Sequence, residues 1–175
     1  MDIKLRRIAP TDVEDIARLA NDPLIARMTA TLPYPYTRED AQQWIDEMPD
    51  EPDEHVFAVC LGDEFIGIIG LVYNPQHNRA ELGYWLGSAY WGKGYATAAA
   101  VLAIDYAFET LNVRKVYGNC YAVNPGSRRV LEKSGMKFEG CLQQHAVRLG
   151  EVHDLLCFGL LREEYLERKQ QHANG

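Results

Sequence analysis

Two closely spaced glycines, in the segment Gly92-Lys93-Gly94, are the residues of this sequence best suited to bind an anion. Strand-like aromatic and apolar residues precede them at positions 81–86, and strong helix formers follow at 96–111, with apolar residues at helical spacing. Glycines at such a junction let the backbone turn tightly and leave no Cβ over the amides, so N–H groups at the helix start can converge on one anion. We therefore predict a phosphate-binding loop between a strand and a helix.

Two common phosphate-binding motifs do not fit this loop. The P-loop of nucleotide-hydrolysing enzymes requires Gly-x-x-x-x-Gly-Lys-Ser/Thr, whereas a tyrosine follows the second glycine here. The dinucleotide fingerprint requires glycine or alanine where Thr97 stands, and an acidic residue about twenty positions beyond the loop. Arg114, Lys115 and Val116 occupy that later region, so the loop lacks an acidic partner for a ribose.

The composition is that of a globular protein with one core. The chain has 175 residues, of which 47% are hydrophobic and 25% charged, so we expect a single domain over 1–175 with a polar tail at 162–175. Long apolar runs and a signal-peptide core are both missing, which predicts a soluble cytoplasmic protein without a membrane partner. The net charge, 18 minus 25 or −7, disfavours a nucleic-acid partner and mildly favours a cationic substrate.

The cysteines give no sign of a disulfide or a metal site. Cys60, Cys120, Cys141 and Cys157 are widely spaced, form no C-x-x-C pair and have no regular histidine partner. All four fall in predicted strands. We therefore expect buried, reduced thiols and no bound metal.

Periodicity and turn residues predict an alternation of strands and helices around the glycine loop. The order is β-α-α-β-β-β-α-β-α-β-β, with the first two helices capped at Thr11 and Thr37 and a short later helix capped at Asn124. Segment 21–35 is interpreted as a turn-rich loop, 49–54 as a polar connection and the tail as a polar helix or frayed end. Strands 56–60, 65–73 and 79–86 should form an antiparallel meander. Because a helix joins 79–86 to 115–121, these two strands should be parallel neighbours.

The glycine loop also carries a family resemblance. Trp91-Gly92-Lys93-Gly94-Tyr95-Ala96-Thr97 is similar to the pyrophosphate loop of the GNAT superfamily of N-acetyltransferases, whose general pattern is Gln/Arg-x-x-Gly-x-Gly/Ala. Trp91 replaces the Gln/Arg, a form that resembles the RimJ/RimL-like subgroup of ribosomal-protein N-terminal acetyltransferases. Asn124-x-x-Ser127, and the run Lys133-Ser134-Gly135-Met136-Lys137-Phe138-Glu139-Gly140, resemble two further family patterns.

The resemblance implies both a fold and a reaction. The implied fold is α/β (α+β): a mixed, mostly antiparallel sheet of six to seven strands, helices on both faces and a splayed central parallel pair. The implied reaction is direct attack of a neutral primary amine on acetyl-CoA in a ternary complex. The implied cofactor-binding residues are Trp85, Leu86, Trp91, Gly92, Lys93, Gly94, Tyr95, Ala96, Thr97, Asn119, Asn124 and Ser127.

Proton transfer has several candidates. The resemblance makes Ser127 a candidate acid toward the leaving thiolate, although Asn124 and Ser127 would also suit a helix cap alone. Glu81 resembles the glutamate that some family members use as general base, but it could simply pair with Arg79. Residues 136–149 and 152–161 are predicted to form a closing hairpin, whose His145 and His153-Asp154 could reach the acceptor, although isolated histidines are more often structural. The amine could also lose its proton to bulk water.

The predictions for the residues that bind the acceptor amine rest on the same resemblance. Tyr34, Tyr36 and Trp44 could line a substrate groove with His145, or Trp44 could be core while the tyrosines cover a loop. The subgroup suggests a protein N-terminal α-amine as acceptor, with polyamines, amino acids and antibiotic amines open. A non-catalytic acyl-CoA-binding module and a dinucleotide-binding oxidoreductase remain alternatives. Either a monomer or a homodimer is compatible with the sequence.

Overall fold

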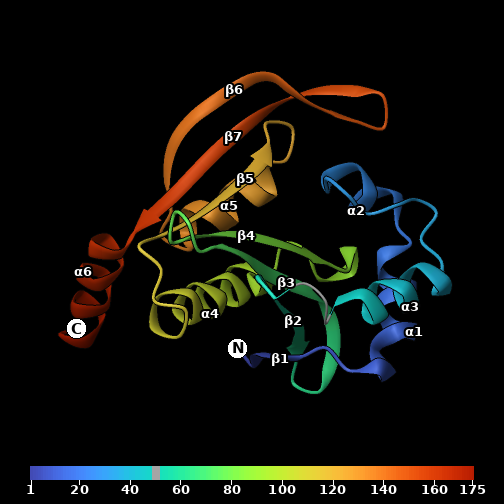
Figure 1. The fold of residues 1–175 in the computed structure, drawn as a ribbon, viewed down its shortest axis with the longest axis horizontal. Helices are drawn as coiled ribbons and strands as arrows, with labels where there is room; N and C mark the ends of the chain where they lie inside the picture. Colours follow the sequence, from blue (N-terminus) through green and yellow to red (C-terminus); the bar gives the residue numbers. More distant parts are fainter. Residues whose placement is uncertain (49–51) are drawn as a thin grey trace.

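Seven strands form one sheet in the computed structural model, in the order β1-β2-β3-β4-β5-β7-β6 (Figure 1). The structure describes residues 1–48 and 52–175, so part of the predicted connection at 49–54 lies outside the described residues. The meander of β2, β3 and β4 is antiparallel, and β4 and β5 are parallel, as predicted. The strands are β1 (Ile3–Arg7), β2 (Glu54–Leu61), β3 (Glu64–Asn74), β4 (Arg79–Leu86), β5 (Lys115–Tyr121), β6 (Lys137–Arg148) and β7 (Glu151–Leu161).

Six α-helices connect or flank these strands in the described part of the chain. One of them, α2, was not predicted, because its six residues are too few to show a helical period. Its start is nevertheless encoded: the Asp22 carboxylate accepts the Leu24 N–H at 2.9 Å, and Pro23 occupies the first turn. The helices are α1 (Val13–Ala20), α2 (Pro23–Met28), α3 (Arg38–Glu47), α4 (Tyr95–Glu109), α5 (Pro125–Lys133) and α6 (Arg162–Ala173).

The caps predicted for the first two helices, at Thr11 and Thr37, had different outcomes. At α3 the cap is confirmed, since Thr37 Oγ1 accepts the Asp40 N–H at 3.1 Å while the Asp40 carboxylate accepts the Thr37 N–H at 2.8 Å. At α1 it is wrong. Thr11 lies in a 3₁₀ turn, and the neighbouring Asp12 accepts the Ala9 N–H at 2.7 Å, so the carboxylate closes this turn in place of a threonine cap.

Hydrophobic clusters cover both faces of the sheet. On one face α4 packs against the central strands through Ala100, Ile104 and Phe108, a four-residue spacing that keeps one stripe of the helix buried. On the other face α1 and α3 pack through Ile16 and Ile45 onto β2 and β3 (Figure 1). We call these two sides of the sheet the α4 face and the α1/α3 face. The predicted helices on both faces are confirmed.

Strands β4 and β5 pair over only three residues each. Their register runs from Arg79↔Lys115 to Glu81↔Tyr117 and then stops, although both strands continue. The predicted splay of the central parallel pair is therefore present. It opens a gap in the sheet just before the glycine loop.

The cysteines are all free in the described residues, as expected, but not all buried. Cys60 and Cys120 are buried, whereas Cys141 is exposed and Cys157 is half-buried. The prediction fails for Cys141 because β6 is the outermost strand and most of its side chains face solvent. Over residues 1–48 and 52–175, no cluster of His, Cys, Asp and Glu could hold a metal ion, and no helix is long and apolar enough to span a membrane.

A bidentate ion pair fixes the start of the chain. Arg6 donates from both terminal nitrogens to Asp12, each at 2.8 Å, and Asp12 is only 4% exposed. Burial opposes ionisation of Asp12, but the hydrogen bonds from Arg6 and Ala9 outweigh it and hold the pKa of this carboxyl below its usual value. The pair therefore stabilises the fold at neutral pH.

We expect Asp12→Asn to lower the free energy of unfolding by about 2 kcal/mol at pH 7, because it leaves Arg6 without its charged partner. The folded-state pKa is depressed, so this stabilisation is complete above the unfolded pKa of about 3.9 and is lost as pH falls through the folded value. Urea denaturation at pH 7 and pH 3 measures both effects. Asp15→Asn, which breaks an exposed pair with Arg18, should change stability by less than about 1 kcal/mol. Equal stability of Asp12→Asn and wild type at pH 7 would contradict the assignment.

Candidate active site

The glycine loop has the backbone expected of an anion cradle. Gly92 and Gly94 have φ angles of 72° and 82°, in the left-handed region that favours glycine, and Gly94 is the N-cap of α4. The loop itself is exposed, and α4 begins at Tyr95. The amides of the first turn, Tyr95 to Thr97, have no partner within the helix and point out of its positive end. An anionic group can therefore bind them directly.

Trp91 anchors this loop to the splayed strand. Its indole Nε1–H donates to the Leu86 carbonyl at 2.9 Å, while the side chain stays 43% exposed. The residue that departs from the general family pattern therefore has a structural task of its own. It holds the loop against the end of β4.

Only one of the two predicted β4 backbone contacts faces the gap. Gly87 N–H donates to Ile66 on β3, so alternation along the strand directs the amide of Trp85 toward β3 as well. The amides of Tyr84 and Leu86 point the other way, toward β5, where strand pairing has ended. Of the two predicted contacts, Leu86 N–H is therefore the one that can reach a carbonyl oxygen in the gap, and Trp85 contributes its side chain to the α1/α3 face.

Ser127 and Tyr84 form a pair of hydroxyl groups at this gap. Ser127 Oγ and Tyr84 Oη lie 2.7 Å apart, and either can donate. Burial raises the pKa of Tyr84 to about 12, although the hydrogen bond with Ser127 opposes this rise. The phenol therefore keeps its proton at neutral pH and can supply it through Ser127. Sequence analysis did not identify Tyr84, whose partner is 43 residues away.

Asn124 positions Ser127 at the start of α5. The Asn124 side-chain oxygen accepts the Ser127 N–H at 3.1 Å, which confirms the predicted cap. Because this bond uses the backbone of Ser127, the hydroxyl remains free for Tyr84. The same short turn thus caps a helix and leaves the Ser127 hydroxyl directed at Tyr84.

Glu81 lies at the closed end of the splay. It is half-buried, and its Oε2 accepts a long, 3.4 Å hydrogen bond from the Tyr117 hydroxyl. The Arg79 guanidinium lies 5.4 Å from the centre of the Tyr117 ring, so these three side chains form one cluster. Asn119, two residues beyond Tyr117 on β5, is half-buried and points to the same face. The catalytic role of Glu81 and the cofactor role of Asn119 stay predictions.

The predicted acceptor residues differ in their exposure. Tyr36 is 6% exposed and belongs to the α1/α3 cluster, and Trp44 packs partly buried against it. Tyr34 is 49% exposed, and His145 is exposed on the outer strand β6. Packing therefore accounts for Tyr36 and Trp44, while Tyr34 and His145 remain accessible to a substrate.

Arg148, at the end of β6, ties the hairpin of β6 and β7 to α2 and to the segment that follows it. Its guanidinium donates to three backbone carbonyls: that of Ala26 at 2.8 Å, that of Ala30 at 3.3 Å and that of Leu32. A second, exposed tie joins Arg27 to Glu151 at 3.4 Å. Sequence reasoning missed this clamp because it joins residues more than a hundred positions apart.

We expect Arg148→Met to raise KM for the acceptor about tenfold, because residues 26–32 precede the loop that carries Tyr34 and lose their fixed position. Arg148→Lys should recover only part of the loss, since the donors of an ammonium lie on one nitrogen, whereas those of a guanidinium are spread over three and can reach separate carbonyls. Steady-state kinetics with varied acceptor measures this, with the exposed Arg7→Met as matched control. An unchanged acceptor KM, or an equal loss in acetyl-CoA affinity, would contradict the expectation.

Comparison with known families identifies the family of the fold. Residues 2–137 match the family model described as "Acetyltransferase (GNAT) domain". The chain belongs to the GNAT family. Members of this family use acetyl-CoA, and the splayed strand pair and the glycine loop at the start of α4 are where we predict that it binds.

Relatives of this GNAT chain agree on the reaction but not on the acceptor. It is 30% identical over 168 residues to the "Uncharacterized N-acetyltransferase p20" of Bacillus licheniformis, covering 93% of this chain and 94% of the relative. It is 33% identical over 173 residues to the "Putative ribosomal N-acetyltransferase YdaF" of Bacillus subtilis strain 168, covering 93% of each. A solved spermidine N-acetyltransferase from Vibrio cholerae, in complex with CoA and spermine, matches with a TM-score of 0.82 at 26% identity, covering 94% of this chain and 98% of that one.

These similarities make the chain an acetyl-CoA-dependent N-acetyltransferase. The residues present fit the cosubstrate. The exposed glycine loop and the first turn of α4 offer amides to a pyrophosphate, and the gap beside Leu86 offers one to the acetyl oxygen.

Proposed function

We propose that this enzyme acetylates a primary amine by direct attack within a ternary complex, using Ser127 as the acid. The hydrogen-bonded pair of Ser127 and Tyr84 carries the proposal, because it puts a protonated hydroxyl relay at the gap between β4 and β5. A thiolate leaving this gap needs a proton, and a phenol with a pKa of about 12 has one to give at neutral pH.

The proposed step is balanced without a covalent enzyme intermediate. The neutral amine attacks the acetyl carbonyl, a C–N bond forms, and the C–S bond of the thioester breaks. Leu86 N–H stabilises the oxyanion that develops between these events. Ser127 protonates the departing sulfur and is reprotonated from Tyr84, while the proton of the amine leaves on the acceptor side. Tyr84 then regains a proton from solvent, which restores the enzyme for the next turnover.

Our first candidate acceptor is the α-amine of a protein N-terminus. Two observations support it: the form of the loop from Trp91 to Thr97 resembles the RimJ/RimL-like subgroup, and the relative YdaF carries a ribosomal N-acetyltransferase name at 33% identity. An N-terminal α-amine has a pKa of about 7.7–8.0, so a useful fraction is already neutral at cellular pH.

A polyamine is the second candidate. The matched structure from Vibrio cholerae is a spermidine N-acetyltransferase that contains spermine, and the net charge of −7 would attract a polycation. Both candidates are primary amines and use the same proton relay. They differ in what must fit beyond the reacting nitrogen.

A thiol-release assay with a panel of amines distinguishes them. The panel contains peptides with free N-termini, the same peptides blocked by acetylation, spermidine and an aminoglycoside. Turnover of the free peptides only, with mass spectrometry showing an acetylated α-amine, supports the first candidate, and turnover of spermidine only supports the second. Stabilisation by acetyl-CoA without thiol release from any amine would overturn the proposed reaction and indicate a non-catalytic acyl-CoA-binding module.

A further inference from the structure

His153, on β7, is a buried imidazole with an unused nitrogen. The residue is 5% exposed, and Nε2 has no hydrogen-bond partner among residues 1–48 and 52–175. The nearest carboxylate oxygen, Glu151 Oε2, lies 3.6 Å away, which is too far for a hydrogen bond. Leaving a buried polar nitrogen unpaired costs free energy, and such a group in a folded protein calls for an explanation.

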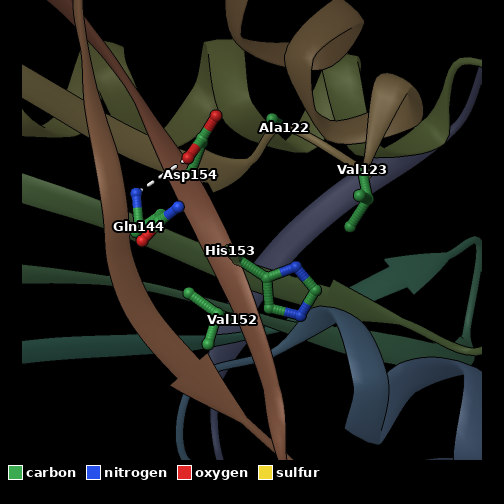
Figure 2. Close-up of a pocket in the computed structure, with 6 residues that line it drawn as sticks. All are labelled: Ala122, Val123, Gln144, Val152, His153 and Asp154. Atoms are coloured by element: carbon green, nitrogen blue, oxygen red, sulfur yellow. Dashed lines mark hydrogen bonds between the residues drawn. The ribbon is translucent and has the colours of Figure 1, made fainter.

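The ring is held in place and lines a hollow. It stacks on Tyr121 with centroids 4.6 Å apart and planes 20° from parallel. The hollow has a volume of about 410 Å³, and Figure 2 shows the imidazole pointing toward the side of Val123, away from Gln144 and Asp154. The lining residues are Ala122, Val123, Gln144, Val152, His153 and Asp154.

Strand register puts this ring at the open end of the splay. Glu81 is level with Tyr117 in the last parallel pair, so four residues further along each strand Tyr121 comes level with Trp85. Trp85 packs on the α1/α3 face, and Tyr121 shares that face because each residue lies four positions, an even number, beyond a member of the last pair. Stacked on Tyr121, His153 therefore lies across the gap from Trp85 and Leu86.

The two proton-transfer groups thus occupy opposite sides of the sheet. Tyr84 and Leu86 of β4 pack toward the α4 face, where Tyr84 meets Ser127. His153 lies on the other face. A thioester held between the strands would meet its acid from one side and an attacking amine from the other, which is the arrangement that direct transfer requires.

We propose that His153 binds the acceptor amine through Nε2 and takes its proton as the C–N bond forms. This inference rests on the proposed function. The proton moves from the amine nitrogen to His153 and then to solvent, while CoA sulfur receives a separate proton from Ser127, so charge balances at each step. His153, not the sequence-predicted Glu81, is then the catalytic base.

Position along the strand favours His153 over Glu81. Glu81 is five residues from Leu86 on β4, about 16 Å at 3.3 Å per residue, whereas the strand registers place His153, on β7, within about one residue of the level of Leu86. Glu81 is also engaged by the Tyr117 hydroxyl.

The charged groups around His153 suit a cationic ligand. Glu151 lies near its Nε2, and Arg27 offsets part of that charge through its 3.4 Å contact with Glu151. Asp154 is the next residue on β7, and its Oδ1 accepts the Gln144 N–H at 2.8 Å. Arg148 directs its guanidinium to the backbone carbonyls of Ala26 in α2 and of Ala30 after it. Two carboxylates near the hollow would therefore attract the ammonium form of an amine before it loses its proton.

His153→Gln and His153→Ala test the proposal, with the exposed His77→Gln as matched control. We expect kcat/KM for the amine to fall about 30-fold in both, less than a full general base contributes because water still accepts the proton. Stabilisation by acetyl-CoA should be unchanged, and added imidazole should restore part of the activity of His153→Ala only. A kcat/KM within about twofold of wild type would overturn the proposal. It would also be overturned if the variants lost acetyl-CoA binding together with activity and imidazole restored no activity to His153→Ala.

A measurement on the unsubstituted protein keeps the proposal testable if these variants fail to fold. The ring-nitrogen NMR signals of His153 should shift when CoA and the acceptor amine are added together, and should not shift with CoA alone. Unchanged signals with both present would overturn the proposal. An inactive wild type would instead overturn the proposed function.

Discussion

Ser127→Ala should lower kcat about 1,000-fold while leaving the affinity for acetyl-CoA nearly unchanged. The size follows from the loss of a general acid, which contributes about 10²–10⁴. The substitution spares the fold, because the cap at α5 uses the Ser127 backbone N–H and the Asn124 side chain. Stopped-flow release of thiol measures kcat, and a thermal shift with acetyl-CoA measures binding.

Two further variants separate the members of the pair. Tyr84→Phe should also lower kcat, because Ser127 is then no longer reprotonated from a neighbouring phenol. Ser127→Cys should recover part of the activity, since a thiol can supply a proton where alanine cannot. Full activity of Ser127→Ala would reduce Ser127 to a helix-cap residue and remove the acid from the proposed reaction.

Gly94→Val should weaken acetyl-CoA binding about 100-fold, or about 2.7 kcal/mol. Gly94 has a φ of 82°, which a β-branched residue adopts only with strain, and a side chain there would stand over the amides that we propose bind the pyrophosphate. Its Cβ would meet only the flexible end of Met1, at 3.4 Å, so the effect should fall on the loop and leave the core intact.

Gly140→Val is the matched control, because a Cβ there meets nothing within 4 Å and its φ lies outside the left-handed region. Thermal shifts at acetyl-CoA concentrations about 100 times the wild-type Kd should show about 2.7 kcal/mol of stabilisation for wild type and for the control, and far less for Gly94→Val. Equal stabilisation of all three proteins would place the pyrophosphate elsewhere.

Local signals of the sequence predicted most of the fold. Caps such as Thr37 and Asn124 involve residues no more than four positions apart, and the alternation of apolar and polar residues in a strand is visible directly in the sequence. The splay of β4 and β5 came from the family resemblance, not from periodicity. Local signals failed where a tertiary partner intervened: Asp12 pairs with Arg6 and closes a turn that the sequence pattern assigned to Thr11.

The candidate site was predictable only in part. The glycine loop and the Asn124-x-x-Ser127 turn are contiguous in sequence, so their geometry could be anticipated. Tyr84 and Arg148 act through partners 43 and 116 or more residues away, and His153 differs from an ordinary core histidine only in the nitrogen that lacks a partner. Such roles depend on which distant residues the fold brings into contact, and one sequence alone does not show these contacts.

A two-substrate kinetic matrix, with acetyl-CoA and the best amine of the panel both varied, tests the central claim most directly. Direct attack in a ternary complex predicts double-reciprocal lines that intersect, and an intact mass that stays unchanged when the protein meets acetyl-CoA alone. Parallel lines, together with a protein heavier by one acetyl group, would show a covalent acetyl-enzyme and contradict the account.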